Sequence, residues 1–418
     1  MIELQDDTKK VEHVTNPASI KVMGIGGAGG NTVNSLVASG ADYIQSIAVN
    51  TDAQALHLSK ADHTIQVGNK STKGLGTGAN PELGKKAAEE DIDKLMDLVT
   101  DTDIVFLTAG MGGGTGSGAL PVVAHAMKEQ NILTIAVVTL PFEFEGKRRT
   151  RVAQQAIENL KKEVDTLIII PNQKLLDVVD RNVSMLDAFA MINDVLVQSV
   201  TGITDIITKA GHINVDFADV RTIMKGMGLA VMGSATATGE NRAQEATLKA
   251  ITSPLLENMR IKGAHGVLLN ITGGRDLSLH EISEAANIIY EEAAEDAHII
   301  LGSVVDDTLE NEVKVTIIAT GFETEKDKQT DETPKPVVEV SQPEPINVVQ
   351  PAQHEPQMVA APQYNPNPDT TKNVENTVER EEPAIETVES SRSTVFVDTE
   401  DLDVPTFLRK ESVEEDNQ

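Results

Sequence analysis

Residues 108–118 read TAGMGGGTGSG, a glycine-rich turn between two segments of different character. The apolar run 103–107 precedes the turn and predicts a buried strand, and residues 119–129 have the pattern of a helix. Five of the seven residues from Gly112 to Gly118 are glycines, so few side chains block the approach of a ligand to the backbone. A strand, a glycine turn and a helix in this order point backbone N–H groups at an anion.

The turn therefore predicts a phosphate-binding site, in which Thr115 and Ser117 add hydroxyl donors. A flexible surface linker is the other interpretation, since linkers are commonly rich in Gly and Ser. Linkers rarely lie so tightly between a buried strand and a helix, and this favours phosphate binding.

The composition excludes several classes of protein. A chain of 418 residues with 40% hydrophobic content is long enough for two globular domains. The absence of cysteine excludes a disulfide framework, a thiol nucleophile and a cysteine metal site. The formal net charge of -30, the 3% aromatic content and the absence of Trp argue against a nucleic-acid partner. No apolar run approaches the roughly 20 residues of a membrane span, and the N-terminus lacks a signal-peptide core, so we expect a cytoplasmic protein without direct membrane insertion.

Apolar runs alternate with helical segments over the first part of the chain, which predicts a parallel, doubly wound sheet. In such a sheet, ligands bind beyond the carboxyl ends of the strands. Four glycine-rich or charged turns fall at those ends, at 26–31, 70–80, 110–118 and 141–149. Strands are expected at 20–25, 44–49, 64–67, 103–108, 132–139 and 165–170, and helices from Pro81 and over 147–163.

A long helix is expected over 184–209, with Gly211 as its C-terminal cap, followed by a short helix opened by residues 214–219. A smaller domain with a mostly antiparallel or mixed sheet and helices on one face is expected over 227–321. Its expected strands are 228–237, 266–272, 298–305 and 312–319, and its expected helices are 241–252 and 278–293.

The composition changes after Gly321. Residues 323–396 are rich in Pro, Glu, Gln, Asn and Thr and have little to bury, so we expect a disordered linker. The run Asp401–Arg409, DLDVPTFLR, is a short apolar motif at the end of this tether. Its layout is typical of a peptide that folds on binding a partner, and a chance apolar cluster is the alternative.

Residues 24–29 offer a competing nucleotide interpretation, because they match G-x-G-x-x-G after a strand and before a helix. Asp52 ends the second strand at the spacing expected of a ribose-binding acid, so this part alone would indicate an NAD(P)-binding oxidoreductase. A dinucleotide site has no need of the further glycine turns at 70–80 and 110–118. No Walker motif is present, which excludes the P-loop class.

With these turns in order, the chain resembles the tubulin/FtsZ family of GTPases over residues 20–321 and the terminal peptide. The resemblance implies an α/β, tubulin-like two-domain fold with a parallel nucleotide domain, a long central helix, a smaller mixed-sheet domain and a disordered tail. The matching strings are GIGGAGGN, AVNTDAQAL, TKGLGTGANPELG, AGMGGGTGSG, PFEFEGKRR, IPNQKLL, NVDFADVRT and DLDVPTFLR. The implied parts are a flexible N-terminus 1–18, a GTP-binding domain 19–183, a central helix 184–210, a catalytic loop and helix 211–226, a second domain 227–321, a linker 322–396 and a partner-binding peptide 397–418.

The same resemblance assigns the nucleotide-binding residues. Backbone amides would hold the phosphates, FEGKRR would contact the nucleotide near the ribose, and one face of the long helix would hold guanine. Phe189 has core packing as its alternative role, and Asp194 competes with its neighbour for the base. The assigned residues are Gly27, Ala28, Gly29, Gly30 and Asn31, then Gly114, Thr115 and Gly116, then Glu145 and Arg149, and finally Phe189 and Asn193.

Asn214, Asp216 and Asp219 are the catalytic residues that the resemblance implies. The two aspartates lie three residues apart at the start of a helix, where helix capping is an equally good reason for Asp216. In the family, this loop of one subunit docks on the nucleotide of the next, and its carboxylates position or polarise the attacking water. Such a contact is heterologous and would build open filaments in which assembly activates hydrolysis.

The implied function is a polymerising GTPase of the bacterial cytokinetic ring at mid-cell, which converts GTP to GDP and phosphate and recruits other division proteins. Its partners would be further copies of itself and membrane-tethering division proteins such as FtsA, bound through Asp401–Arg409. Mg²⁺ would arrive with the nucleotide, since no cluster with metal-ligand spacing occurs in the sequence. The alternatives are an NAD(P)-dependent oxidoreductase and a non-catalytic, nucleotide-dependent scaffold.

Overall fold

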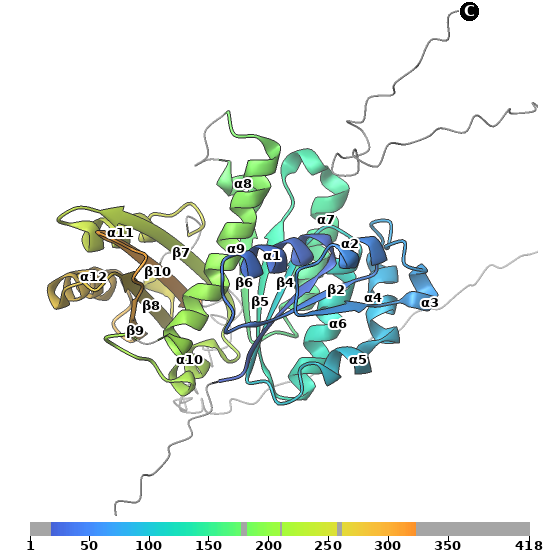
Figure 1. Ribbon diagram of the computed structural model, residues 1–418, viewed down its shortest axis with the longest axis horizontal. Coiled ribbons are helices and arrows are strands. Elements are labelled where there is room, and N and C mark those ends of the chain that lie inside the picture. The colour runs from blue at the N-terminus through green and yellow to red at the C-terminus, as the bar shows by residue number, and fades with distance from the viewer. Residues whose placement is uncertain (1–17, 177–181, 210, 257–260, 323–418) are drawn as a thin grey trace, which may run out of the picture. The chain divides into compact units, whose positions relative to one another are not determined.

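The structure, a computed structural model, describes residues 18–176, 182–209, 211–256 and 261–322 (Figure 1). All of these residues lie in one compact unit. The expected N-terminal segment up to residue 17, the expected linker 323–396 and the expected peptide Asp401–Arg409 lie outside the described residues.

Within the described residues, ten strands form one sheet in the order β3-β2-β1-β4-β5-β6-β7-β10-β8-β9. Every strand pair from β3 to β7 is parallel, which confirms the predicted parallel sheet of the nucleotide domain. The first six strands lie close to their predicted ranges: β1 Ile20–Ile25, β2 Gln45–Asn50, β3 His63–Gln66, β4 Ile104–Gly110, β5 Leu133–Leu140 and β6 Thr166–Pro171.

The remaining four strands continue the same sheet. The β10 strand pairs antiparallel with β7 and β8, and β8 pairs parallel with β9, which confirms the predicted mixed arrangement. The two halves are continuous because Thr166–Ile168 of β6 pair with Gly228–Ala230 of β7, a link that the sequence analysis did not predict. These strands are β7 Gly228–Thr238, β8 Gly266–Gly273, β9 His298–Val305 and β10 Glu312–Thr320.

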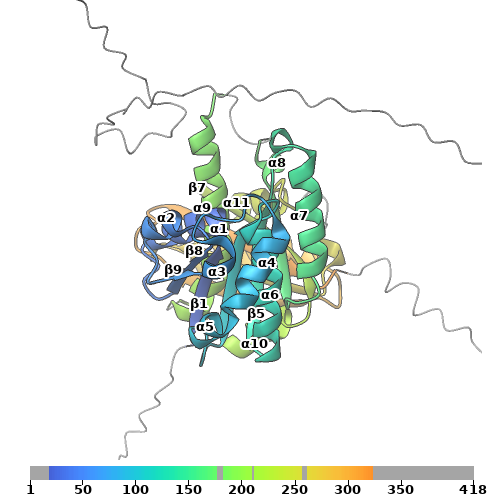
Figure 2. The same cartoon turned by 90° about the vertical axis from the view of Figure 1, so that its right-hand side faces the viewer.

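Helices cover both faces of the first half of the sheet, as a doubly wound fold requires. On one face, α1 (Gly26–Ala38) and α9 (Met185–Thr208) share a core cluster with strand residues such as Phe106. On the other face, shown toward the viewer in Figure 2, α4 (Pro81–Glu90), α6 (Thr115–Glu129) and α7 (Lys147–Leu160) share a second cluster. Shorter helices complete this half: α2 Ala53–His57, α3 Asn69–Thr72, α5 Ile92–Asp97, α8 Asn172–Leu175 and the 3-10 turn η1 Glu143–Glu145.

The two helices of the second half lie on one face of its strands, which confirms the prediction, and helices from outside residues 227–321 cover the other face. The α11 helix (Arg242–Ile251) and the α12 helix (Leu279–Glu292) pack on one face. The α9 helix and the α10 helix (Phe217–Met224) pack on the other. The physical reason is visible in β8, where consecutive residues Leu268 and Leu269 are both buried, so that neither face of the strand can meet water.

The α9 helix confirms the predicted long helix, and the Ser184 side chain caps it by accepting a hydrogen bond from the Asp187 N–H at 3.1 Å. It ends at Thr208 with an extended Lys209, so Gly211 is not the predicted C-terminal cap. By length and composition alone, α9 could cross a membrane. Its buried residues pack against the strands of both halves, which makes it a core helix of this fold.

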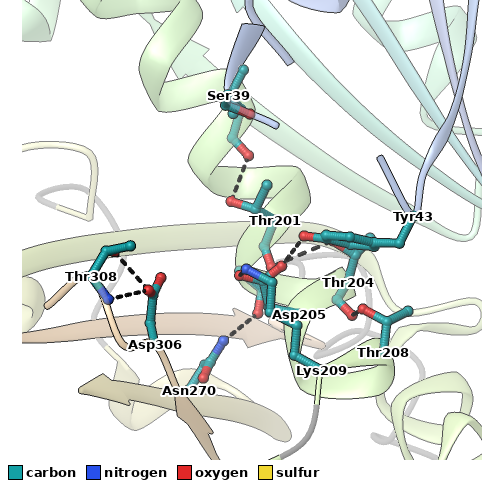
Figure 3. A network of polar contacts seen from close by, with 12 residues as sticks. Ser39, Tyr43, Thr201, Thr204, Asp205, Thr208, Lys209, Asn270, Asp306 and Thr308 are labelled. Atoms are coloured by element: carbon teal, nitrogen blue, oxygen red, sulfur yellow. Dashed lines mark hydrogen bonds and ion pairs between the residues drawn. The ribbon is translucent and has the colours of Figure 1, made fainter. Parts of the chain in front are cut away.

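Polar contacts hold the second half of α9 against both halves of the sheet (Figure 3). The side-chain amide of Asn270 on β8 donates a hydrogen bond to the Gly202 carbonyl oxygen at 3.0 Å. The Tyr43 hydroxyl, just before β2, donates to Asp205, and Lys209 donates to the same carboxylate at 3.0 Å. Burial raises the pKa of Tyr43, and the neighbouring Asp205 raises it further, so the hydroxyl keeps its proton.

A buried ion pair joins α11 to α12. The Arg242 guanidinium, whose side chain is only 7% exposed, donates to Asp276 at 2.6 Å and to Glu281 at 2.7 Å. Glu281 also accepts from the Ser278 N–H at 2.8 Å, as part of the capping box of α12. Burial alone would raise the pKa of Glu281, but the hydrogen bonds from Arg242 and Ser278 outweigh it and hold the pKa below its ordinary value.

We expect Arg242→Ala to lower the free energy of unfolding by about 3 kcal/mol, because it leaves a mostly buried carboxylate without its cation. The contribution of Glu281 is complete above its ordinary pKa of 4.5 and is lost as the pH falls through the lower folded-state pKa. Urea denaturation at pH 7 measures the difference. The matched control, Arg275→Ala, removes an exposed pair with Asp307 and should change little; equal losses in the two variants would contradict this account.

Candidate functional site

The turn after β1 forms the first turn of α1 and is packed directly against β4. The helix begins at Gly26, so Gly27, Ala28, Gly29, Gly30 and Asn31 are helical rather than part of a preceding loop. A Cβ atom on Gly24 would lie 2.2 Å from the Gly29 carbonyl oxygen, and one on Gly29 would lie 2.5 Å from the Thr108 carbonyl oxygen. These two glycines are therefore required for close backbone contact.

The turn after β4 is packed just as closely against residues 77–81. Gly114 is the N-cap of α6, and a Cβ atom there would lie 2.1 Å from the Thr77 hydroxyl oxygen. A Cβ atom on Gly118 would lie 2.0 Å from the Pro81 carbonyl oxygen. Gly26 of α1 also lies against α6, since a Cβ atom on Gly26 would lie 3.1 Å from the Gly116 nitrogen. Three of the four predicted turns thus meet at one edge of the sheet.

Other glycines of these turns face open space. A Cβ atom on Gly27, Gly30 or Gly113 would have no atom of the described residues within 4 Å. Packing therefore does not require glycine at these positions. In a helix, glycine even lowers stability by about 1 kcal/mol relative to alanine. The absence of these side chains leaves the backbone of both turns accessible to a ligand.

The adjacent N-termini of α1 and α6 favour an anion. Neither helix has a side-chain cap, and neither has an acidic residue in its first turn, so their first N–H groups keep their positive partial charge. Two such ends that lie side by side offer N–H groups of the kind that bind phosphate in other proteins. The structure thus brings together the residues from Gly27 to Asn31 and from Gly114 to Gly116.

The hydroxyls in the second turn have a structural use. The Thr115 hydroxyl lies 2.8 Å from the Thr51 hydroxyl and 3.3 Å from the Thr77 hydroxyl, and it joins the turns after β2, β3 and β4. The buried Ser117 hydroxyl accepts a hydrogen bond from the Gly112 N–H at 2.9 Å. This bond stabilises the turn from within and uses only an acceptor position of the hydroxyl, so donation by Ser117 to a ligand stays a prediction.

The fourth predicted turn lies at the same edge. A Cβ atom on Gly112 would lie 2.9 Å from the Arg149 carbonyl oxygen, so the start of α7 borders the turn after β4. Glu145 and Arg149 form an ion pair with each other, and Glu145 also accepts from the Phe142 N–H at 2.9 Å. The two residues assigned to the ribose thus lie together beside the glycine turns.

Phe189 and Asn193 share one face near the start of α9. The Phe189 ring packs edge-to-face on Phe142 with 5.6 Å between ring centroids, so it is part of the core and only partly buried. Asn193 is partly buried one turn later. Asp194 lines a separate cavity of about 530 Å³ with Tyr43 and Asp205, which favours Asn193 as the residue that faces the same way as Phe189.

Asn172, the first residue of α8 after β6, was not among the predicted site residues. Its side chain is only 5% exposed, and its amide oxygen has no hydrogen-bond partner among the described residues. An unpaired buried acceptor is costly and calls for a partner outside the protein atoms. Its position after a parallel strand, within IPNQKLL, was the available signal.

Asp52 has a structural role in its own loop. Its carboxylate accepts hydrogen bonds from the Gln54 and Ala55 N–H groups at 2.9 and 3.3 Å and so caps α2. This local role accounts for an acid at the end of β2 without a dinucleotide.

Asn214, Asp216 and Asp219 lie at the opposite edge of the sheet. The α10 helix that carries the aspartates is tied to Asn131, just before β5, by Lys225 at 2.9 Å, so it lies near the amino ends of the strands (Figure 1). Asp216 occupies the N-cap position, but its carboxylate accepts no capping hydrogen bond, and both aspartates are exposed. The structure therefore does not bring these carboxylates to the glycine turns of the same chain.

Comparison with known proteins agrees with this arrangement. Residues 19–180 match the GTPase domain of the tubulin/FtsZ family, and residues 228–323 match the C-terminal domain of the FtsZ family. The chain belongs to the tubulin/FtsZ family. It is accordingly a GTPase that binds guanine nucleotides, and the oxidoreductase and non-catalytic alternatives are set aside.

Solved structures of this family share the fold. An empty FtsZ dimer from M. jannaschii is 45% identical, with a TM-score of 0.70, and the match covers 73% of this chain and 88% of that one. The GDP-bound CetZ1 monomer from Haloferax volcanii is 26% identical, with a TM-score of 0.64 and coverage of 74% and 97%. A GTPγS-bound protofilament of CetZ2 from the same organism is 22% identical, with a TM-score of 0.64 and coverage of 74% and 96%, and shows the fold alone.

We expect Gly27→Asp to abolish nucleotide binding without unfolding the protein. A carboxylate in the first turn of α1 stabilises the helix by roughly 0.5 kcal/mol but repels phosphate. Affinity for a fluorescent guanine nucleotide should fall by at least about 100-fold, since like charges in contact cost several kcal/mol. The control Ala38→Asp adds the same charge at the other, exposed end of α1 and should bind normally. Tight binding by Gly27→Asp would contradict the phosphate assignment.

Proposed function

We propose that this chain is a polymerising GTPase that assembles head-to-tail and completes its hydrolytic site between two copies. The supporting observation is the separation of the two groups of site residues. The uncapped N-termini of α1 and α6 lie at the carboxyl edge of the sheet, whereas Asp216 and Asp219 are exposed at the amino edge. A second copy stacked in the same orientation would bring its amino edge to the nucleotide of the first.

In this proposal, each edge has its own chemical task. The backbone amides of Gly27 to Asn31 and of Gly114 to Gly116 hold the phosphates, Glu145 and Arg149 contact the ribose, and Phe189 with Asn193 holds guanine. Asn214, Asp216 and Asp219 of the next copy position or polarise the attacking water. Mg²⁺ bound with the nucleotide offsets the charge of the phosphates. The carboxylates can act only after assembly, so assembly activates hydrolysis.

The contact between copies is heterologous, because different surfaces of the two copies meet, and such contacts extend into open filaments. The FtsZ relative from M. jannaschii, solved as a dimer, supports self-association. We further propose that the filaments form the cytoplasmic ring of bacterial division at mid-cell and recruit other division proteins. Asp401–Arg409 would bind membrane-tethering proteins such as FtsA.

The split site predicts a threshold. Phosphate release with GTP and Mg²⁺ should rise only above the protein concentration at which light scattering reports assembly. Asp216→Ala should still assemble but release phosphate at least about 100-fold more slowly, the size of a lost general-base contribution. The control Glu158→Ala changes an exposed carboxylate on α7 and should leave both readouts unchanged. Phosphate release that is linear from zero concentration would sink the split site.

The tail makes a separate prediction. Deletion of residues 401–409 should leave the threshold and the rate of phosphate release unchanged and should abolish binding to FtsA in a co-sedimentation assay. A reversed-sequence version of the same nine-residue segment is the matched control for length and charge. Loss of assembly on deletion would show that the peptide acts within the filament instead.

A further inference from the structure

The loop between α9 and α10 lies directly against the backbone of β9. A Cβ atom on Gly211 would lie 1.6 Å from the Ser303 carbonyl oxygen and 3.2 Å from the Val304 Cα atom. Gly211 does not have a left-handed backbone, so close contact rather than an unusual φ requires glycine there. No larger residue fits unless the loop moves away from the strand.

Two further contacts hold the same loop. The Ser303 N–H donates to the Ile213 carbonyl oxygen at 3.0 Å, and the two residues form an antiparallel bridge. The Gly211 N–H donates to the Asn214 side-chain oxygen at 3.0 Å. The loop is thus fastened to β9 at Ser303, and the position of the Asn214 side chain depends on Gly211.

The outer position of β9 explains why this contact is available. The strand is the last in the sheet, so the backbone groups on its free side have no neighbouring strand. Gly302 continues the close contact, since a Cβ atom there would lie 2.0 Å from the Ile206 side chain and 3.2 Å from that of Val215. The end of α9 and the loop therefore lie on one short stretch of β9.

The contact uses the backbone of Ser303 and not its side chain. The Ser303 hydroxyl is fully buried, and its oxygen has no hydrogen-bond partner among the described residues. Removal of a buried hydroxyl whose oxygen has no partner breaks no hydrogen bond within the described residues, so Ser303→Ala should cost little. The loop is held by the N–H and carbonyl groups of Ser303, which any residue except proline would supply.

We propose that the free edge of β9 at Ser303 sets the geometry of the catalytic loop, and that Gly211 is a positioning residue for hydrolysis. This inference rests on the proposed function, in which Asn214 and Asp216 act on the nucleotide of a neighbouring copy. Gly211 touches no substrate. It acts by allowing the loop to reach β9, which fixes where Asn214 and the start of α10 lie.

The test is Gly211→Ala in the full chain. We expect phosphate release per assembled subunit to fall by at least about tenfold, because a displacement of about 1 Å at a catalytic group can cost roughly 100-fold in rate. Nucleotide affinity, measured with a non-hydrolysable GTP analogue, should not change, because the glycine turns of the same chain lie at the other edge of the sheet. A merely structural role would lower the melting temperature and assembly in step with hydrolysis, and that result would overturn the proposal.

Two controls and a second variant make the outcome decisive. Gly263→Ala adds the same methyl group where the nearest atom, on Phe322, is 3.7 Å away, and should behave as the parent protein. Ser303→Ala should also retain full hydrolysis, since only the backbone is used. If Gly211→Ala does not fold, Gly302→Ala places a Cβ atom 2.0 Å from the buried Ile206 side chain near the end of α9 and should also lower hydrolysis. A normal rate in that variant would overturn the proposal. Normal hydrolysis in Gly211→Ala with a slow Asp216→Ala would reject the β9 contact alone, whereas normal rates in both variants would reject the proposed function.

Discussion

The close backbone contact among the glycine turns at the carboxyl edge is the constraint on which the rest of the structure depends. Gly114 lies against Thr77 and Gly118 against Pro81, at distances that leave no room for a Cβ atom. Because these contacts draw the turns together, the N-termini of α1 and α6 lie side by side and concentrate their positive partial charge. The hydroxyl of Thr115 then joins the turns through neighbouring hydroxyls, so the ligand surface consists mainly of backbone.

The α9 helix connects this edge to the opposite one. Phe189 and Asn193 lie near its start beside the nucleotide edge, and Gly211 and Asn214 follow its end beside β9. At 24 residues, the helix is about 36 Å long, which is enough to pass under the sheet from one edge to the other. The hydrogen bond from Asn270 and the Asp205 contacts fasten it to both halves, so a single helix connects the nucleotide edge to the proposed catalytic loop.

Much of the fold could be predicted because it follows from local pattern. Each parallel strand is a short apolar run bounded by turn residues, and Pro81 marks the start of α4 as expected. The pairing of β6 with β7 could not be predicted, since contact between distant strands leaves no local signal. The backbone of Gly211 and the internal hydrogen bond of Ser117 could not be predicted for a related reason. A residue type shows neither the direction of a hydroxyl nor whether a glycine provides a left-handed φ or room for a neighbouring strand. The resemblance to a known family, and not the pattern alone, assigned roles to Asn214 and Asp216.

The central claim is that one site is built from two copies of the chain, and mixing two inactive variants tests it most directly. Gly27→Asp lacks a working nucleotide edge but keeps its catalytic loop, and Asp216→Ala lacks the carboxylate but keeps its nucleotide edge. Phosphate release from each variant alone and from an equal mixture would be measured at the same total protein concentration. The account predicts almost no release from either variant alone and clear release from the mixture, because the intact loop of one chain can meet the intact nucleotide edge of the other. A mixture no more active than its separate components would contradict it, since each chain would then need both parts in its own fold.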